Sequence, residues 1–400
     1  MTRKKTTIDW RSSKSGTTAV WAGELESFWH GATQVPVVHG VTFAYEDLDE
    51  WMKVALGEKE GHIYSRNTNP TVNVFEEKIR VLEGAEGSTS FATGMAAISN
   101  TLFTLLSPGQ RVVSIKDTYG GTSKMFLEFL PRFGVKVTLC DTADHEQIER
   151  EVASGCEVLY LESPTNPTLK VLDLKRLAKA GKTARAIVVV DNTFASPINQ
   201  RPLELGADLV VHSATKFLGG HSDAMGGALC GRKDLVQKVF HFREITGATL
   251  HPMSAYLLVR GMKTLEVRVQ RQNENALELA RFLKQHPKIE EVFYPGLETH
   301  PGHEIAKRQM KGYGGVMSFS LKGGFREVKT FLERLKFVHL AASLGSVGTL
   351  AGPPKTTSHV ETSAEERKAL GIPEGLIRYS VGIENVQDLK ADLESALAVL

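Results

Sequence analysis

The chain has 400 residues, of which 42% are hydrophobic and 24% charged, and its formal net charge is +2 at pH 7. This balance gives no reason to expect binding to nucleic acid or to a membrane surface, and no apolar run reaches the roughly 18 residues that a membrane helix requires. The three cysteines, Cys140, Cys156 and Cys230, lack metal-ligand spacing and indicate a reducing compartment. We therefore expect a soluble cytoplasmic protein, with two domains rather than one.

An N-terminal arm that contacts a neighbouring subunit is predicted over residues 1–60. It begins with the basic run "TRKK" (residues 2–5), which we interpret as a solvated chain end. Weak strand character is present over residues 31–43.

Residues 61–255 are predicted to form a large domain with a mostly parallel central sheet. Strand-like runs alternate here with helical stretches, at residues 88–92, 111–115, 135–140, 157–162, 186–191 and 207–213. The run "AIVVVD" lacks polar alternation, which is typical of strands buried on both faces of a parallel sheet. The alternation of strands and helices indicates an α/β architecture.

Residues 256–400 are predicted to form a smaller α+β domain. One long helix is expected over 255–285 as the link between the two domains, because apolar residues recur there at helical spacing. A strand at 376–384 and a closing helix at 386–400 follow, with an amphipathic helix at 326–335 before them.

The residues that follow the strand-like runs are the candidates for a site, because ligands of open α/β sheets bind beyond the carboxyl ends of the strands. After the first run, Gly94 and Met95 open a helix whose free N–H groups can bind a phosphate. After the second run, Tyr119 lies on a loop where its ring could cover a flat ligand. At the end of the fourth run, Glu162 is interpreted as a solvated charge, and Asn166 follows on a loop that two prolines stiffen.

The last two runs end in residues that suit a cofactor with a phosphate, an aldehyde and an aromatic ring. Asp191 needs a cationic partner, because an unpaired buried charge is unfavourable, and a protonated ring nitrogen would be one. In "HSATK", the hydroxyls of Ser213 and Thr215 could reach a phosphate while the Lys216 amine reaches an aldehyde. These are the parts that pyridoxal phosphate (PLP) requires.

A metal site is not expected. His300 and His303, in "HPGHE", are the nearest candidates, but no further close His or Cys completes a zinc ligand set. We interpret this segment as a polar loop before a helix.

An ordered set of motifs identifies the chain as similar to a known family. The motifs run from about residue 30 to the C-terminus: "YSRNTNPT", "TGMAAI", "YGGT", "ESPTNP", "DNTF", "HSATKFLGGHSD", "SLGS" and "LIRYSVGIE". They resemble the Cys/Met metabolism (transsulfuration) family of PLP-dependent enzymes, which includes cystathionine γ-synthases, cystathionine γ-lyases, methionine γ-lyases and O-acylhomoserine sulfhydrylases. The resemblance implies the PLP-dependent transferase fold of the aspartate aminotransferase type (fold type I).

The resemblance implies catalytic roles for Lys216, Asp191 and Tyr119. Lys216 would bind the cofactor aldehyde and later move a proton from the substrate Cα, and burial should lower the pKa of its amine enough for that task. Asp191 would pair with the pyridine nitrogen, and Tyr119 would stack on the ring and contact the substrate.

Other residues would hold the cofactor and the substrate. By the resemblance, the phosphate ligands would be Gly94, Met95, Ser213 and Thr215. Asn166 and Ser343 would help to place the cofactor and the substrate. Arg378 would clamp the substrate carboxylate, a task that suits a planar guanidinium.

A site shared between two chains is also implied. Tyr64 and Arg66, in "YSRNTNPT", would reach the phosphate held by the neighbouring subunit. We therefore expect a homodimer, and from the family a tetramer.

The sub-function is predicted from a few positions that differ within the family. Gly121 stands where bacterial methionine γ-lyases often carry cysteine, Ala342 stands where cystathionine-handling members often carry glutamate, and "GPPKTTSH" (352–359) is similar to the sulfhydrylase branch. "GGHSD" is instead similar to the synthase and lyase branches. We expect γ-substitution on an O-acyl-homoserine with a thiol or sulfide. The alternative is γ-elimination on methionine or cystathionine, which gives a 2-oxo acid, ammonia and a thiol.

A catalytically silent PLP-binding or regulatory protein is the hypothesis from another class. It predicts the loss of a catalytic residue, whereas Lys216, Asp191, Tyr119 and Arg378 are all present.

Overall fold

The computed structural model describes residues 8–24, 31–357, 360, 365, 367 and 370–400. The basic run "TRKK" and the last two residues of "GPPKTTSH" lie outside these ranges. Within them, none of the helices is both long and apolar enough to span a bilayer.

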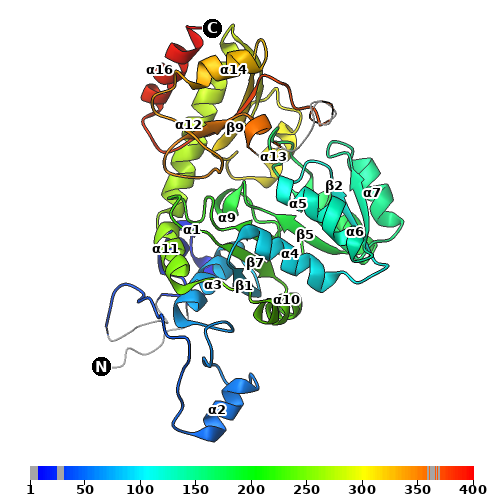
Figure 1. Cartoon of the computed structure of the whole chain (residues 1–400), viewed down its shortest axis with the longest axis vertical. Coiled ribbons are helices and arrows are strands. Elements are labelled where there is room, and N and C mark those ends of the chain that lie inside the picture. The colour runs from blue at the N-terminus through cyan, green and yellow to red at the C-terminus, as the bar shows by residue number, and fades with distance from the viewer. Residues whose placement is uncertain (1–7, 25–30, 358–359, 361–364, 366, 368–369) are drawn as a thin grey trace.

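A seven-stranded sheet, in the order β1-β7-β6-β5-β4-β2-β3, forms the larger part of the molecule (Figure 1). Its strands are β1 (Gly87–Phe91), β2 (Arg111–Ile115), β3 (Lys136–Cys140), β4 (Val158–Glu162), β5 (Ile187–Asp191), β6 (Leu209–Ser213) and β7 (Gly227–Gly231). The strands from β6 to β3 run parallel, and β7 runs antiparallel to both β1 and β6. The predicted α/β fold with a mostly parallel sheet is confirmed, although β7 lies in a glycine-rich stretch that has no strand pattern.

The central strands are apolar throughout because both faces of the sheet are covered. Tyr160 and Val189 enter a core that α4 and α10 share, whereas Leu159 and Val190 enter a second core against α7 and α8. The helices of this part are α3 (Pro70–Glu83), α4 (Gly94–Leu105), α5 (Gly120–Lys124), α6 (Leu130–Arg132), α7 (His145–Ala153), α8 (Leu174–Thr183), α9 (Ser196–Asn199) and α10 (Lys233–Thr246), with a π-helical turn η2 (Met125–Phe129).

A five-stranded sheet, in the order β10-β11-β12-β9-β8, forms the smaller part. Its strands are β8 (Ile289–Phe293), β9 (Val316–Leu321), β10 (His339–Leu340), β11 (Leu350–Gly352) and β12 (Leu376–Ser380). Leu283, Phe331 and Leu393 of the neighbouring helices pack on this sheet. The helices after residue 290 are α13 (His303–Gln309), α14 (Phe325–Leu332), η3 (Pro354–Thr356) and α16 (Val386–Leu397).

The link between the two sheets is made of two helices, α11 (Pro252–Met262) and α12 (Leu265–Gln285). The prediction of one continuous helix over 255–285 is therefore wrong at its centre. The backbone leaves the helical path at Thr264, and the Gly261 carbonyl accepts a 2.9 Å hydrogen bond from the Arg268 side chain. This bond gives a carbonyl at the end of α11 a partner from outside its own helix.

The N-terminal segment contains η1 (Trp10–Ser12), α1 (Ser15–Trp21) and α2 (Leu48–Ala55). Figure 1 shows α2 projecting from the body of the molecule. The weak strand character over 31–43 yields only an isolated bridge between Thr42 and Tyr64. Side chains at the start of α3 form hydrogen bonds with the backbone of this segment. Val38 N donates to Thr71 Oγ1 at 2.9 Å, and the Asn69 side chain donates to Val38 O at 2.9 Å.

Gly227 offers a test of how β7 meets the start of α4. A Cβ at Gly227 would lie 2.1 Å from the Thr93 carbonyl oxygen, whereas a Cβ at Gly87 would meet only ordinary contacts at 3.5 Å. We expect Gly227→Ala to lower the free energy of unfolding by about 1–3 kcal/mol through overpacking. The matched control Gly87→Ala should stay within about 0.5 kcal/mol of the wild type. Denaturant unfolding of both variants checks this, and equal stabilities would contradict it.

Candidate active site

A cavity of about 370 Å³ lies where the carboxyl ends of β4, β5 and β6 meet the start of α4 and the segment before β11. Its lining includes every residue predicted for the site apart from Tyr64 and Arg66: Gly94, Met95, Tyr119, Asn166, Asp191, Ser213, Thr215, Lys216, Ser343 and Arg378. It shares Thr215, Met225 and Ser343 with a wider hollow of about 960 Å³ that opens beside it. Residues distant in the sequence therefore surround one space.

Asp191 is a buried carboxylate at the end of β5. It accepts hydrogen bonds from Thr193 N at 3.0 Å and from the Tyr160 hydroxyl at 3.4 Å, and both donors are neutral. Burial raises the pKa of Asp191 above its usual value, and the neighbouring Thr193 and Tyr160 oppose that rise. A cationic group in the cavity would stabilise the ionised carboxylate.

Glu162 ends the neighbouring strand β4, in register with Asp191. The interpretation of Glu162 as a solvated charge is wrong, because its side chain is 3% exposed and lines the cavity. It accepts a 2.9 Å hydrogen bond from Tyr119 N, which holds the loop that carries Tyr119. Burial, and then the charge of Asp191, raise the pKa of Glu162 well above its usual range.

The Lys216 amine points to Ser343, with 2.8 Å between Nζ and the Ser343 hydroxyl oxygen. Burial, and then the positive charge of Arg378, lower the pKa of Lys216 to about 8. A larger share of this amine is therefore neutral near pH 7 than for an exposed lysine, whose pKa is near 10.4. A neutral amine is the form that acts as a base or a nucleophile.

Ser343 links the lysine to Arg378. Its backbone has φ +93°, a conformation that non-glycine residues rarely adopt and that surrounding contacts must hold. Its carbonyl accepts a 2.8 Å hydrogen bond from Arg378 Nη2, while Arg378 Nη1 donates to Asn166 Oδ1 at 2.9 Å. Burial lowers the pKa of Arg378 to about 10. Arg378 thus presents a fixed cation to the cavity, where a carboxylate would be its natural partner.

The residues predicted to bind a phosphate lie at the start of α4 and at the end of β6. Thr93 caps this helix by accepting a hydrogen bond from Ala96 N at 3.0 Å, and helix geometry leaves the Gly94 and Met95 amides without partners inside the helix. A Cβ at Gly94 would lie 2.6 Å from Ser213 Cβ, so only glycine lets the end of β6 approach so closely. The Ser213 amide is in turn held by Thr193 Oγ1 at 2.9 Å.

Tyr119 lies at the rim of the cavity and is 46% exposed. Gly121 sits against it, because a Cβ there would lie 2.9 Å from the Tyr119 ring and 2.9 Å from Met95 Sδ. A side chain at position 121 would therefore displace the ring or the methionine.

Tyr64 and Arg66 lie outside the cavity of their own chain. The Arg66 guanidinium stands over the Tyr64 ring, 5.2 Å from its centroid, and Tyr64 is 39% exposed. Their predicted role in the site of a neighbouring subunit stays a prediction.

The structure adds residues to the site that the strand-end argument did not select. Thr193 is one of them and binds both Asp191 and Ser213. Its signal was present, since it stands two residues after Asp191 in the motif "DNTF". Tyr160 carried no comparable signal, because it lies inside an apolar strand and only the pairing of β4 with β5 brings it to Asp191.

The residues present fit PLP. Asp191 has only neutral donors and would gain a partner in a protonated ring nitrogen. Asn166 Nδ2 is buried without a hydrogen-bond partner, and a ligand oxygen would supply one. A Cβ at Gly94 would collide with Ser213, so glycine is what lets these two predicted phosphate ligands lie together.

The sequence of this chain is similar to that of known enzymes. The family model for the Cys/Met metabolism PLP-dependent enzymes matches residues 16–398. An L-methionine gamma-lyase from Fusobacterium nucleatum subsp. polymorphum is 46% identical over 96% of this chain and 97% of its own. The chloroplastic cystathionine gamma-synthase 1 of Arabidopsis thaliana is 40% identical over 97% of this chain and 69% of its own.

A solved structure has the same fold. The cystathionine gamma synthase of Xanthomonas oryzae pv. oryzae, in complex with aminoacrylate and cysteine, superposes with a TM-score of 0.91. It is 38% identical and the match covers 96% of this chain and 98% of that one.

Replacing Asp191 tests the electrostatics of the cavity without cofactor. Since burial raises the folded-state pKa of Asp191, its ionised form destabilises the cofactor-free fold above about pH 4, where the unfolded chain ionises. We expect Asp191→Asn to raise the free energy of unfolding of the cofactor-free protein at pH 7 by about 1–3 kcal/mol. The gain should vanish as the pH falls to about 4.

Urea unfolding at several pH values measures this effect. Asp144→Asn is the control, because Asp144 is an exposed helix cap that accepts from Gln147 N, and asparagine caps equally well. An Asp191→Asn protein that is no more stable than the wild type at pH 7 would contradict the prediction.

Amine labelling tests the environment of Lys216. In the cofactor-free protein, we expect the labelling rate of Lys216 to rise with a midpoint near pH 8. Arg378→Met should move this midpoint upward, because it removes a positive charge that disfavours the protonated amine. Mass spectrometry of the labelled peptides gives the rates, with the exposed Lys329 as the internal reference. A wild-type midpoint near 10.4, as for a free lysine, would show that the pKa of Lys216 is not lowered and would contradict the prediction.

Proposed function

Because this chain belongs to the Cys/Met metabolism family of PLP-dependent enzymes, we propose that it catalyses γ-elimination on methionine, releasing a 2-oxo acid, ammonia and a thiol. The family is one of γ-synthases and γ-lyases with PLP as the cofactor. The choice of reaction and substrate within that family is our proposal.

The chemistry of the cavity wall carries this proposal. Among the described lining residues, Arg378 and Lys216 are the only cations, and apolar side chains such as Ile98, Met225 and Leu344 form much of the remainder. Methionine has one carboxylate for Arg378 and an uncharged thioether for the apolar wall. Cystathionine has a second charged amino-acid head, for which these lining residues offer no cation beyond Lys216, which the cofactor would occupy.

The relatives support the same choice. The two Fusobacterium nucleatum proteins that are 46% and 45% identical to this chain are both named L-methionine gamma-lyase. The sequence favoured γ-substitution on an activated homoserine, partly because Gly121 replaces a cysteine that methionine γ-lyases often carry. The relatives favour the alternative over that first expectation.

The residues of the chain have distinct tasks in this mechanism. When bound, PLP withdraws electrons from the substrate and so permits proton loss at Cα and Cβ and departure of the γ substituent. Arg378 binds the substrate carboxylate and thereby fixes Cα within the cavity. Lys216 Nζ, with its lowered pKa, accepts the Cα proton and is available to return it. Ser343 keeps that amine in place through its hydroxyl.

The carboxylates and the ring of Tyr119 complete the site. Asp191 supplies a negative charge in a buried place, where it stabilises a nearby cation strongly. Glu162 fixes the backbone of Tyr119, and Tyr119 covers the mouth of the cavity against water. A dry cavity strengthens the electrostatic contacts inside it.

γ-Substitution on an O-acyl-homoserine is the second candidate. Its support is the similarity to cystathionine γ-synthases, at 40% identity for the Arabidopsis protein and a TM-score of 0.91 for the Xanthomonas structure. The two reactions use the same residues up to the loss of the γ substituent. They differ in whether a thiol then adds.

A substrate panel separates these candidates. We expect methionine to yield a 2-oxo acid and a thiol, with kcat/KM at least tenfold above that for cystathionine, which corresponds to about 1.4 kcal/mol. O-acetylhomoserine and O-succinylhomoserine should be tested with and without cysteine or sulfide. Keto acid and thioether products are measured for each.

Formation of a thioether from an O-acyl-homoserine, with no keto acid from methionine, would refute γ-elimination and support substitution. A protein that turns over none of these compounds, although it binds PLP, would contradict both candidates.

A further inference from the structure

Arg268 on α12 is a buried cation with carbonyl partners. Its side chain is 3% exposed. The guanidinium donates to the carbonyls of Phe217 at 2.9 Å, Leu218 at 3.3 Å and Gly261 at 2.9 Å, and Nε donates to Thr264 Oγ1 at 3.1 Å. All four acceptors are neutral. Burial lowers the pKa of Arg268 to about 10.

Placing a cation among neutral acceptors is unfavourable compared with an apolar side chain of similar size. The acceptors show what this arrangement achieves. Two of them, Phe217 and Leu218, follow Lys216 directly, and the third, Gly261, is near the end of α11. One side chain therefore ties the turn that carries the lysine to both linking helices.

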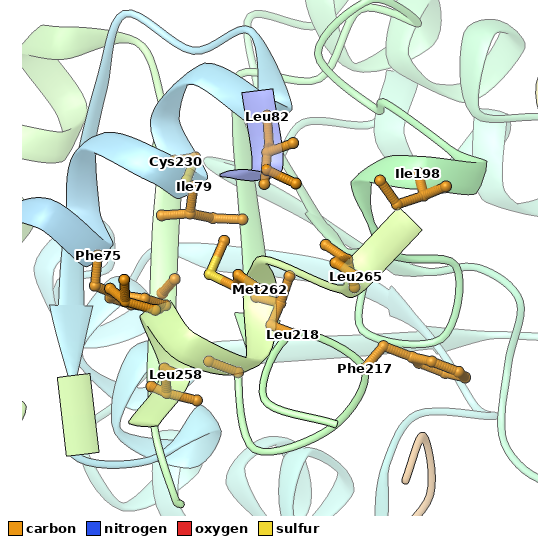
Figure 2. Packing of buried hydrophobic residues seen from close by; sticks show 14 of the residues in the cluster. Phe75, Ile79, Leu82, Ile198, Phe217, Leu218, Cys230, Leu258, Met262 and Leu265 are labelled. Carbon is orange, nitrogen blue, oxygen red and sulfur yellow. The ribbon is translucent and has the colours of Figure 1, made fainter. Parts of the chain in front are cut away.

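The neighbouring backbone is shaped around this guanidinium. A Cβ at Gly220, which has φ +73°, would lie 2.0 Å from Arg268 Nη1. A Cβ at Gly261 would lie 2.1 Å from the Gly219 carbonyl oxygen, so the end of α11 touches the same turn. Leu218, Met262 and Leu265 belong to one buried apolar cluster beside this turn (Figure 2).

The turn is also held by segment 343–347, which lies between β10 and β11. Val347 N donates to the Gly220 carbonyl at 2.9 Å, and Lys216 Nζ donates to Ser343. A Cβ at Gly345 would lie 2.7 Å from Phe217 N. The turn 216–220 is thus hydrogen-bonded both to Arg268 and to segment 343–347.

We propose that Arg268 is a positioning residue for Lys216, because its guanidinium fixes the turn 216–220 on the linking helices and so keeps the lysine amine at Ser343. This inference rests on the proposed role of Lys216 in binding the cofactor. It differs from a purely structural role, in which loss of Arg268 lowers stability but leaves the amine where it is.

The test compares Arg268→Lys and Arg268→Met with the control Lys78→Met. Lysine keeps the charge but cannot bond three carbonyls in a planar fork. Lys78 is a buried cation outside the cavity lining: it donates to the carbonyls of Ala19 and Val20 and also pairs with Glu24 at 3.0 Å, so its loss should lower stability without touching the turn 216–220. For each full-length variant, we would measure the melting temperature, the pH midpoint of Lys216 labelling without cofactor, and the rate at which PLP leaves the holoenzyme.

In both Arg268 variants we expect the labelling midpoint to rise by about half a unit or more, because a looser turn exposes the amine to water. PLP release should accelerate about tenfold, the effect of losing one hydrogen bond of ordinary strength. Lys78→Met should lower the melting temperature but leave the midpoint and the release rate at their wild-type values.

An Arg268→Lys protein with the wild-type midpoint and release rate would overturn the inference, and so would failure of both Arg268 variants to fold, which indicates a role in folding. Lys216→Ala distinguishes failure of the proposed role of Lys216 from failure of the inference on Arg268. If that variant keeps the visible absorbance of covalently bound PLP, the proposed role of Lys216 fails and the inference fails with it. If the absorbance is lost but Arg268 variants behave as wild type, only the inference fails.

Discussion

The hydrogen bond from Lys216 Nζ to Ser343 Oγ joins the two sheets at the cavity. Lys216 follows β6 of the seven-stranded sheet, and Ser343 lies between β10 and β11 of the five-stranded sheet. Ser343 also presents its carbonyl to Arg378 on β12. Lys216 and Arg378 are therefore held through one residue with a strained backbone, and the relative placement of the two sheets decides the geometry of the site.

The charges of the cavity are arranged in two pairs that need a ligand. Glu162 and Asp191 lie side by side with neutral donors, and their pKa values are raised because burial penalises the ionised forms. Burial lowers the pKa values of Lys216 and Arg378, and the positive charge of Arg378 lowers that of Lys216 further. A molecule with a cationic ring and a carboxylate would give Asp191 and Arg378 the partners of opposite charge that the protein itself does not supply.

Much of the fold and of the site could be predicted from local patterns. The runs that became β4, β5 and β6 were recognisable because central strands covered on both faces are largely apolar, and the earlier runs because they alternate with helical stretches. Asp191 and Ser213 could be selected because each ends such a run, and Gly94 because it closely follows one. The break between α11 and α12 could not be predicted, because apolar residues recur at helical spacing on both sides of it. The hydrogen bonds of Arg268 to Gly261 and to the distant turn after Lys216 are visible only in the structure. The burial of Glu162 likewise depends on its strand neighbours.

By itself, the sequence determined the order of β1 to β6, the polar residues at strand ends and the family, because these depend on local periodicity and on motifs, whereas β7 and the break between α11 and α12 were not visible in it. The tertiary structure alone decided which of these residues meet. It brought Arg378, Asn166 and Ser343 to Lys216, and left Tyr64 and Arg66 outside the cavity of their own chain. The physical reason is that these contacts form only when the two sheets pack together. Packing buries the charges, brings backbone segments close and lets distant segments form hydrogen bonds, and a linear pattern does not give the distances between such segments.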